Sequence, residues 1–420
     1  MLLALVASSM GFAQTTPATP RLAFSEYLRR VGSSNLDAAA QRLNVPIAEA
    51  QIAMGRVFPD PQLTAGISQY DLTQAGNQTG LQVMVQVPMQ IGGQRAARVE
   101  AAEAALSVTR AELEEFLRRL RGAAADAWID GLHARLIRER KLQTMKSLER
   151  LVAVNQLRLK AGDIGEATLI QSRVEAEQFR AAVFDAEGSV KVADLRILLF
   201  LGEEGRPLFD EPLELDGRLE ALADRDFSLA TLLEQAKRQR PDALAARLRI
   251  KANESQLALT RANRIVDLNI GAGWQHYFPT SEPFALPAAE LLTATVTVPL
   301  PFSRMYRGDV VAAETALAQS AVSSAALELQ IETEVRQARA RYNASAAQVR
   351  VYRTVLSEAD KVLEKTLYNY QRGGATLVEV LVAQRTVDDV YLSYFEALVA
   401  TAHALVAVEL SAGFWDLDLK

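Results

Sequence analysis

The sequence predicts a mainly α-helical protein with a membrane β part, built as two similar halves. Three observations support this prediction: an internal duplication, two very long proline-free helical segments, and a pair of alternating strands before each of them. A repeat of this kind indicates similar structural units that pack together. A chain of 420 residues could form two or three ordinary domains, but the duplication favours two halves of one body joined by a connector.

The duplication places matching residues about 211 positions apart. The segment VPMQIGGQRAARVEAAEAAL begins at Val87, and its counterpart VPLPFSRMYRGDVVAAETAL begins at Val298. The same offset still places Gly162 on Gly373, with no net insertion between the two anchor points. A segment that keeps its length so strictly is expected to be one rigid rod.

Composition excludes several classes of function. The net charge of -5 and the pI near 5.6 argue against nucleic-acid binding, because no basic stripe stands out from the mixed charges. The chain has no cysteine, which excludes disulfides and thiolate metal sites, and we expect no cofactor. Basic runs at 118–121 and 135–141 lie among acidic residues and are expected to form solvated helix faces.

The N-terminus predicts a secreted protein. Residues 1–13 form a short apolar run followed by small residues, which indicates a signal peptide, and residues 14–35 are expected to be extended. No later segment has the roughly 18 uninterrupted apolar residues of a membrane helix. If this protein crosses a membrane, it is expected to do so with strands.

Residues 61–90 and 267–301 each predict two strands. Leu63, Ala65 and Ile67 alternate with polar residues, and the second copy repeats this alternation. Each strand has about 10 residues, the length that a tilted strand needs to span a bilayer. The polar stretch 71–80 between the first two strands is expected to be a solvent-facing loop. The alternation alone does not exclude the alternative that the strands form two soluble hairpins packed on a core.

The number of strands decides how such a sheet could lie in lipid. Four strands are too few to close a barrel with an interior, and an open edge in hydrocarbon leaves N–H and C=O groups unpaired. Closure therefore requires other copies of the chain. Three copies would supply twelve strands, an even number that is wide enough for a watery lumen.

The helical segments predict long antiparallel coiled coils. They run from about 92 to 160 and from about 304 to 372, each about 100 Å long at 1.5 Å per residue. Shorter helices flank them at 36–57, 167–201, 241–265 and 377–410. The first repeat then covers 36–201 and the second 240–411, with a connector at 202–239 and a tail at 412–420. A soluble helical bundle remains the alternative for the helices alone.

On these residues the chain resembles the TolC-type outer-membrane efflux proteins, over essentially everything after the signal. VPMQIGGQRAAR at Val87 and FPDPQLTAG at Phe58 are similar to the heavy-metal subgroup, the CzcC- and CusC-like proteins. The resemblance implies a homotrimer whose twelve-stranded barrel sits in the outer membrane of a Gram-negative bacterium and continues as a helical tunnel across the periplasm. It also implies a periplasmic adaptor and an inner-membrane pump of the RND type as partners. The protein would be a passive conduit for small substrates, heavy-metal cations among them.

The resemblance also assigns residues to the tips of the two helical hairpins. The residues expected at the tips and in contact with the adaptor are Gly162, Asp163, Ile164, Gly165, Gly373, Gly374, Ala375 and Thr376. Tyr370 matches a tyrosine whose hydrogen bond helps to hold the closed state, and Glu379 matches an acidic residue that rings the entrance. The chain departs from the family at Val382, Ala375 and Thr168, where a second acid, an arginine and its acidic partner would stand. Closure by the family's salt-bridge network is therefore not expected.

Three other functions compete with this reading. An enzyme is disfavoured because no phosphate loop, nucleophile elbow or metal-spaced histidine pair occurs. A periplasmic adaptor would have one helical hairpin rather than two, without strands of spanning length. A conduit for type I protein secretion or for drug efflux would use the same trimer, and the tip sequences do not separate it from metal efflux.

Overall fold

The computed structural model describes residues 21–72, 76–280, 286–305, 307–417 and 419. The predicted signal peptide at 1–13 lies outside the described residues. The chain divides into two compact units. Unit 1 comprises residues 1–39, 117–239 and 333–420, and unit 2 comprises 40–116 and 240–332. The two long helices, α4 (Gln94–Ala161) and α8 (Gly308–Gln371), each contribute residues to both units.

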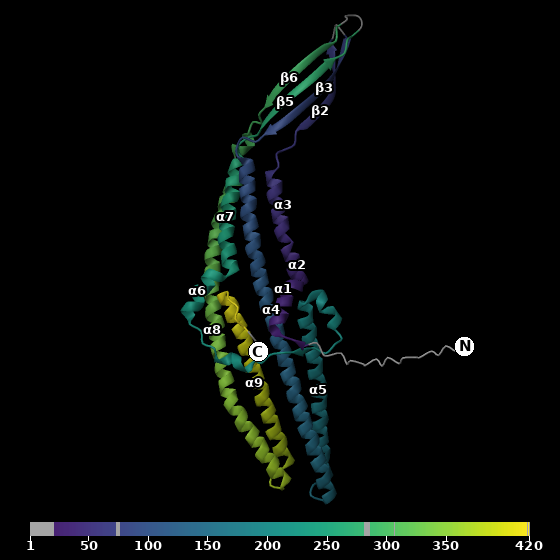
Figure 1. Ribbon diagram of the computed structural model, residues 1–420, viewed down its shortest axis with the longest axis vertical. Coiled ribbons are helices and arrows are strands. Elements are labelled where there is room, and N and C mark those ends of the chain that lie inside the picture. Colours follow the sequence, from purple (N-terminus) through teal and green to yellow (C-terminus); the bar gives the residue numbers. More distant parts are fainter. Residues whose placement is uncertain (1–20, 73–75, 281–285, 306, 418, 420) are drawn as a thin grey trace, which may run out of the picture. The chain divides into compact units, whose positions relative to one another are not determined.

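Unit 2 contains one antiparallel sheet of four strands (Figure 1). The strands are β2 (Gln62–Leu72), β3 (Gly76–Met89), β5 (Leu268–Tyr277) and β6 (Ala289–Thr297), in the order β2-β3-β5-β6. The two predicted hairpins are therefore joined through β3 and β5. The β2–β3 ladder continues to Leu72 opposite Gly76, so the loop predicted at 71–80 is mostly strand. Backbone pairing continues through a polar sequence because the ladder bonds do not depend on side-chain polarity.

The register gives the sheet one apolar face and one polar face. The apolar face carries Leu63, Ala65 and Ile67 of β2, Leu81, Val83, Val85 and Val87 of β3, Ile270, Ala272 and Trp274 of β5, and Leu292, Ala294 and Val296 of β6. The other face carries mainly glutamine, threonine, serine and glycine. Leu292 is 83% exposed and Ile67 is 78% exposed, so unit 2 does not bury the apolar face itself.

The helices of unit 2 are α3 (Asn44–Arg56), α7 (Pro241–Ala262) and the parts of α4 and α8 within it. The sequence predicts one helix over 36–57, but the structure has α2 (Leu36–Arg42) and α3 with a break at Leu43. The ring of Pro46 would clash with the carbonyl of Arg42, four residues earlier, in a continuous helix. The break is therefore a local effect of Pro46.

Unit 1 begins with a short strand and a helix. The strand β1 (Arg21–Leu22) pairs in parallel with β4 (Glu214–Leu215) of the connector. Helix α1 (Phe24–Ser34) corrects the extended segment expected over 14–35. Phe24, Tyr27 and Val31 are buried at helical spacing, and the Tyr27 ring lies 5.1 Å from that of Trp128. This apolar stripe, with about one residue per turn, packs α1 against the rest of unit 1.

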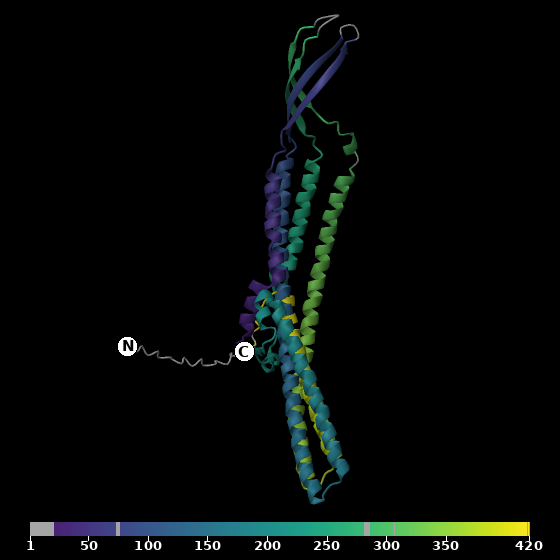
Figure 2. The same cartoon turned by 90° about the vertical axis from the view of Figure 1, so that its right-hand side faces the viewer.

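Two helical hairpins make up most of unit 1. One consists of α4 and α5 (Glu166–Phe200), the other of α8 and α9 (Leu377–Ala412), and they lie side by side (Figures 1 and 2). The connector forms the short helices η1 (Gly202–Glu204), η2 (Arg206–Leu208) and η3 (Glu220–Asp224), followed by α6 (Leu229–Gln239). The second long helix starts at Gly308, after the short helix η4 (Phe302–Met305), rather than near 304.

Among the residues that the structure describes, two helices, α8 and α9, contain an 18-residue window that is apolar enough to cross a membrane by composition. In α9 the window is 72% buried, as expected for a core helix of unit 1, whereas in α8 it is 11% buried. The sequence prediction counted only uninterrupted apolar runs and did not single them out. This apolar window of α8 is thus mostly exposed in the single chain.

The prediction that the basic run at 135–141 is a solvated face is wrong. Arg135 pairs with Asp194 at 2.7 Å, and Arg140 pairs with Asp388 at 2.7 Å, with both partners largely buried. Lys141 lies over the ring of Phe179. The local sequence could not show this, because the acidic partners come from α5 and α9.

Candidate functional site at the helical tips

Both helical hairpins turn through the same backbone motif. Gly162 has φ of 82° and Gly373 has φ of 76°. Each glycine N–H donates to the carbonyl three residues back, Leu159 at 3.0 Å and Tyr370 at 3.1 Å. The next N–H, of Asp163 or Gly374, donates to the carbonyl five residues back, at 2.9 Å in both turns. This is the Schellman end of a helix, and it requires the left-handed conformation that glycine adopts without penalty.

Conformation rather than crowding explains these two glycines within one chain. A Cβ added at Gly162 or at Gly373 would have open space around it. Gly165 and Gly374 are not in the left-handed region, and Gly165 is the N-cap residue of α5. Neighbouring atoms within the single chain therefore do not require glycine at positions 162 and 373.

Glu379 closes the first turn of α9 as part of a capping box. Its Oε2 accepts from the backbone N–H of Thr376 at 2.6 Å and from the Thr376 hydroxyl at 3.0 Å. The Glu379 N–H in turn donates to Thr376 Oγ1 at 3.3 Å. The backbone and hydroxyl hydrogen bonds from Thr376 lower the pKa of Glu379, so the exposed carboxylate is ionised. Glu379 thus has a structural role that the sequence reading did not consider, and it still places a negative charge at the tip.

Tyr370 joins the two hairpins through a buried hydrogen bond. Its hydroxyl donates to Asn155 Oδ1 on α4 at 2.7 Å, and both residues are buried. Arg158, one turn further along α4, donates from Nη1 to the Tyr370 carbonyl at 3.0 Å, and its guanidinium lies 4.8 Å from the centre of the Tyr370 ring. Two residues of α4 therefore hold Tyr370 from its side chain and its backbone.

An apolar cluster surrounds this contact. It contains Leu148, Leu151, Ala176, Tyr370, Leu377 and Val380, with Ala375 and Leu381 packed against it. These residues come from all four helices of the two hairpins, so the tips pack as one body within unit 1. Ala375, where the family's arginine would stand, fills part of this cluster instead.

A second contact between α4 and α9 lies above the tips. Asp388 accepts from Arg140 Nε and from the Thr144 hydroxyl, both at 2.7 Å, and Gln384 donates to its other oxygen. Arg140 also lies 4.0 Å from the ring centre of Tyr391, whose hydroxyl donates to Asp360 of α8. This network links α4, α8 and α9.

A charged cluster around His403 joins α4, α5 and α9, farther from the tips than Asp388. His403 lies between Asp126, at 2.6 Å from Nδ1, and Asp130, at 3.0 Å from Nε2. Arg196 of α5 pairs with the other oxygen of Asp130 at 2.8 Å. Burial alone would lower the pKa of His403, but hydrogen bonds to the two carboxylates raise it to about 9. The imidazole is therefore a cation that binds two helices together.

The sequence analysis singled out Tyr370 and Glu379 but did not point to Asn155 and Arg158, which contact Tyr370. Leu148, Leu151, Asn155 and Arg158 follow one another at intervals of three or four residues, so they lie on one face of α4. A polar residue at such a position commonly fixes one specific helix pairing. That pattern could have pointed to Asn155, although its partner could not be identified without the fold.

Each half of the chain contributes two strands to one amphipathic sheet and one long helical hairpin, the arrangement that the resemblance to TolC-type proteins predicts. The family model described as outer membrane efflux protein matches residues 232–413. The cobalt-zinc-cadmium resistance protein CzcC of Cupriavidus metallidurans is 23% identical over 384 residues, which cover 90% of this chain and 86% of that protein. The second half of the chain thus matches the outer membrane efflux family, and most of the chain is similar to CzcC, in agreement with the predicted resemblance to TolC-type proteins.

Solved structures show the same fold along nearly the whole chain. A structure of CusC matches with a TM-score of 0.75 and 17% identity, covering 94% of this chain and 93% of that one. The outer membrane protein VceC of Vibrio cholerae matches with a TM-score of 0.70 and 16% identity, covering 93% of this chain and 96% of that one. The predicted fold class, mainly helical with a β part, is confirmed.

Proposed function

We propose that this protein forms a homotrimeric, passive conduit through the outer membrane, in which three four-stranded sheets close one twelve-stranded barrel. The observation that carries the proposal is the sheet of unit 2, with its exposed apolar face and two open edges. Strands β2 and β6 each pair on one side only. In hydrocarbon every unpaired backbone group costs several kcal/mol, so each β6 requires the β2 edge of a neighbouring copy.

The polarity of the two faces supports the same arrangement. An apolar outer face meets lipid, and the face rich in glutamine, threonine and glycine lines a water-filled lumen. Exposed apolar residues on α8, among them Val311 and Val322, fit contacts between copies that continue the wall. The trimer thus covers surfaces that a single chain leaves in solvent.

The hairpin tips are proposed as the entrance. Three copies of Glu379 form a ring of carboxylates that attracts cations, because the pKa is held low and the side chain is exposed. The buried Tyr370 contact with Asn155 holds the tips in one arrangement. The residues from Gly162 to Gly165 and from Gly373 to Thr376 are proposed to contact a periplasmic adaptor, and the adaptor to connect the conduit to an inner-membrane pump of the RND type.

The proposed substrates are small solutes, with heavy-metal cations favoured by the likeness to CzcC. Within the described residues no group of three or more His, Asp or Glu side chains could hold a metal ion. The metal proposal therefore rests on the relative and on the carboxylates at the tips. A conduit for type I secretion or drug efflux shares the same trimer and is the alternative.

Cross-linking of the open edges tests the trimer. Because the chain lacks cysteine, pairs of introduced cysteines report one contact at a time. We combine Thr64→Cys on β2 with Thr293→Cys, Thr295→Cys or Thr297→Cys on β6 and oxidise outer-membrane fractions. At least one pair should yield disulfide-linked dimers and trimers on non-reducing gels.

The matched control pairs Thr64→Cys with Met84→Cys, which lie opposite each other within one sheet. This pair should cross-link within the monomer only. A monomer for all three edge pairs, together with a monomeric mass in detergent, would contradict the proposed barrel.

A further inference from the structure

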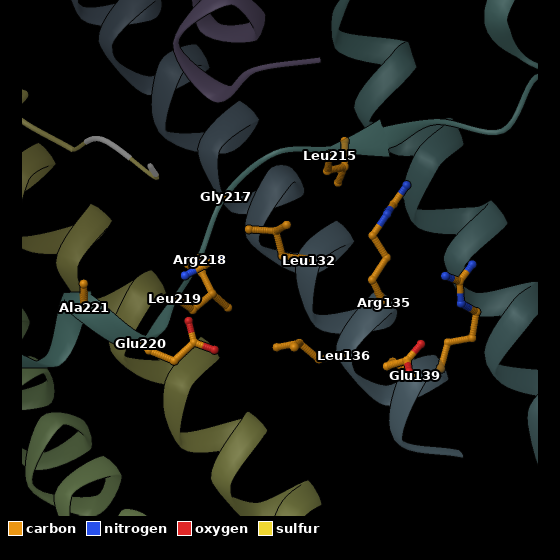
Figure 3. Close-up of a pocket in the computed structure, with 11 residues that line it drawn as sticks. Leu132, Arg135, Leu136, Glu139, Leu215, Gly217, Arg218, Leu219, Glu220 and Ala221 are labelled. Atoms are coloured by element: carbon orange, nitrogen blue, oxygen red, sulfur yellow. The ribbon is translucent and has the colours of Figure 1, made fainter. Parts of the chain in front are cut away.

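Charged and apolar side chains also meet outside the tips. In unit 1, a cavity of about 770 Å³ lies between α4 and the connector (Figure 3). Arg135 and Glu139 on its wall are already bonded within the chain, to Asp194 and Gln143. In unit 2, the sheet carries charged and apolar side chains together on an exposed face, at the end away from α3 and α7 (Figure 1). This exposed group is the one that can meet a partner.

A row of rings ends the apolar face of the sheet. Trp274, His276 and Phe278 are alternate residues along β5 and its continuation, so they share the face that carries Leu81 and Leu292. The ring centres of Trp274 and His276 lie 5.8 Å apart, and those of His276 and Phe278 lie 4.8 Å apart. Two of the three rings contain nitrogen. The apolar face thus ends in side chains that join an apolar body to a polar edge.

A carboxylate lies beside this row. Glu290 of β6 is opposite His276 in the register and therefore on the same face. Its Oε2 accepts a hydrogen bond from Trp274 Nε1 at 3.1 Å, and its Oε1 lies 3.6 Å from His276 Nδ1. The Glu290 side chain is 66% exposed, and a carboxylate can accept further hydrogen bonds. Glu290 is therefore held in place by the rings and remains accessible to donors from outside the chain.

The register places Glu290 at the upper limit of the apolar face. Going from the helices towards the loops, three successive cross-strand rows on this face are apolar apart from the indole N–H, and they contain Val87 with Ile270, Val85 with Ala272, and Val83 with Trp274. The row of Leu81, His276 and Glu290 follows, and Gln69 and Thr79 form the next one. A charged side chain that faces hydrocarbon is unfavourable, and this cost falls towards the membrane surface. Rings with a polar edge are enriched at that surface.

The height of the apolar face agrees with this placement. Leu268, opposite Met89, begins the face at the helical end, and His276 lies eight residues further along β5. At about 3.4 Å per residue and a tilt of about 40°, this stretch covers about 21 Å along the membrane normal. Outer-membrane barrels have an apolar band about 25 Å tall with aromatic residues at its borders. The band therefore fits between Leu268 and the row of rings.

We propose that Trp274, His276, Phe278 and Glu290 form a contact site for lipid headgroups, which fixes how deep the barrel lies in the membrane. This inference rests on the proposed barrel. The rings lie where the acyl chains meet the headgroups, and Glu290 accepts hydrogen bonds from ammonium or hydroxyl groups of the headgroups. Because the carboxylate is unfavourable in hydrocarbon, Glu290 opposes movement of the barrel towards the periplasm.

Nitroxide labels on single introduced cysteines test the depth, since the chain has no cysteine of its own. Thr79→Cys, Leu81→Cys and Val85→Cys place the label on the apolar face of β3 above, at and below the proposed boundary. The protein is reconstituted in nanodiscs of phosphatidylethanolamine with phosphatidylglycerol as the minor component. Power saturation with oxygen and a water-soluble nickel chelate then measures depth. The label at Val85 should be deepest, that at Leu81 should lie within about 5 Å of the boundary, and that at Thr79 should lie in water.

The matched control for these labels is Gln82→Cys on the polar face, next to Leu81. Its label should be accessible to nickel, because that face lines the lumen. A Thr79 label as deep as the Val85 label overturns the headgroup site and leaves the barrel intact. Equal access of nickel to the labels at Gln82 and Val85 would contradict the barrel itself, and the headgroup site with it.

A substitution of Glu290 tests what fixes the depth. Glu290→Leu extends the apolar face by one row, so the label at Thr79 should lie deeper by up to about 5 Å. Thr293→Leu, on the polar face of the same strand, is the matched control and should leave the depth of this label unchanged. The same depth in Glu290→Leu and in the parent protein overturns the role of the carboxylate.

Discussion

The hydroxyl of Tyr370 donates a hydrogen bond to Asn155 at 2.7 Å inside the apolar cluster that joins the two hairpins. Since Arg158 also binds the Tyr370 carbonyl, α8 is attached to α4 just above the tips. The chain has alanine at position 375, where the resemblance places the arginine of the family's closing network, and we propose that the buried Tyr370–Asn155 pair holds the tips instead.

Loss of this hydroxyl should loosen the tips. Tyr370→Phe keeps the ring but leaves the buried Asn155 Oδ1 without its donor, at a cost of about 1–3 kcal/mol. We expect a larger open fraction in single-channel recordings and greater uptake of a bulky hydrophilic antibiotic by cells. Tyr368→Phe, an exposed tyrosine on the same helix, is the control. Equal conductance of Tyr370→Phe and wild type would show that this bond does not hold the entrance.

Substitutions at Glu379 can separate its capping role from its charge. Glu379→Gln retains an oxygen that accepts from the Thr376 N–H but removes the negative charge, whereas Glu379→Ala removes both. Both variants should lower the preference for cations in single-channel recordings, and Glu379→Ala should in addition destabilise the first turn of α9 by about 1 kcal/mol. Thr376→Ala, which damages the cap and keeps the charge, should retain cation selectivity. Unchanged selectivity in Glu379→Gln would remove the carboxylate ring from the proposal.

The buried pair of Arg140 and Asp388 should contribute strongly to stability. Asp388→Ala leaves the Arg140 guanidinium, which is 11% exposed, without its counter-ion, and breaking such a pair costs about 3–5 kcal/mol. The melting temperature by circular dichroism should fall clearly. The exposed pair of Arg180 and Glu149, at 3.2 Å, offers a matched comparison. Glu149→Gln should change stability by less than about 1 kcal/mol. Similar effects of the two substitutions would argue that burial does not decide the strength of these pairs.

The sequence was sufficient for the features that depend on short-range periodicity. Alternation along the strands predicted which side chains share a face, and the register confirms one apolar face across all four strands. Gly162 and Gly373 were expected at the two hairpin tips, and both have the positive φ that glycine adopts without strain. The break at Leu43 was missed although Pro46 signals it, since the apolar pattern continues across it.

Contacts between distant segments could not be predicted in the same way. Arg140 and Asp388 lie on different helices, and a local rule assigns an arginine among acids to solvent. The connector near Arg138 could be recognised as irregular, but not as the wall of a cavity. Asn155 gave a signal through its place on an apolar helix face, yet only the packing of α8 against α4 identifies Tyr370 as its partner.

The His403 cluster predicts how stability depends on pH. Its folded-state pKa of about 9 lies above the value of about 6.5 of an unfolded histidine, because Asp126 and Asp130 both bind the imidazole. A group whose pKa is raised by folding stabilises the protein fully below its unfolded pKa and loses that contribution as the pH rises through the folded one. The melting temperature of the wild type should therefore decline between about pH 6.5 and 9 and level off above that range.

Two histidine variants test this explanation. His403→Gln should have a lower melting temperature at about pH 6.5 and show a smaller decline. His133→Gln should keep the wild-type decline, because burial lowers the pKa of His133. Parallel curves for wild type and His403→Gln would mean that the imidazole does not carry its charge between the two carboxylates.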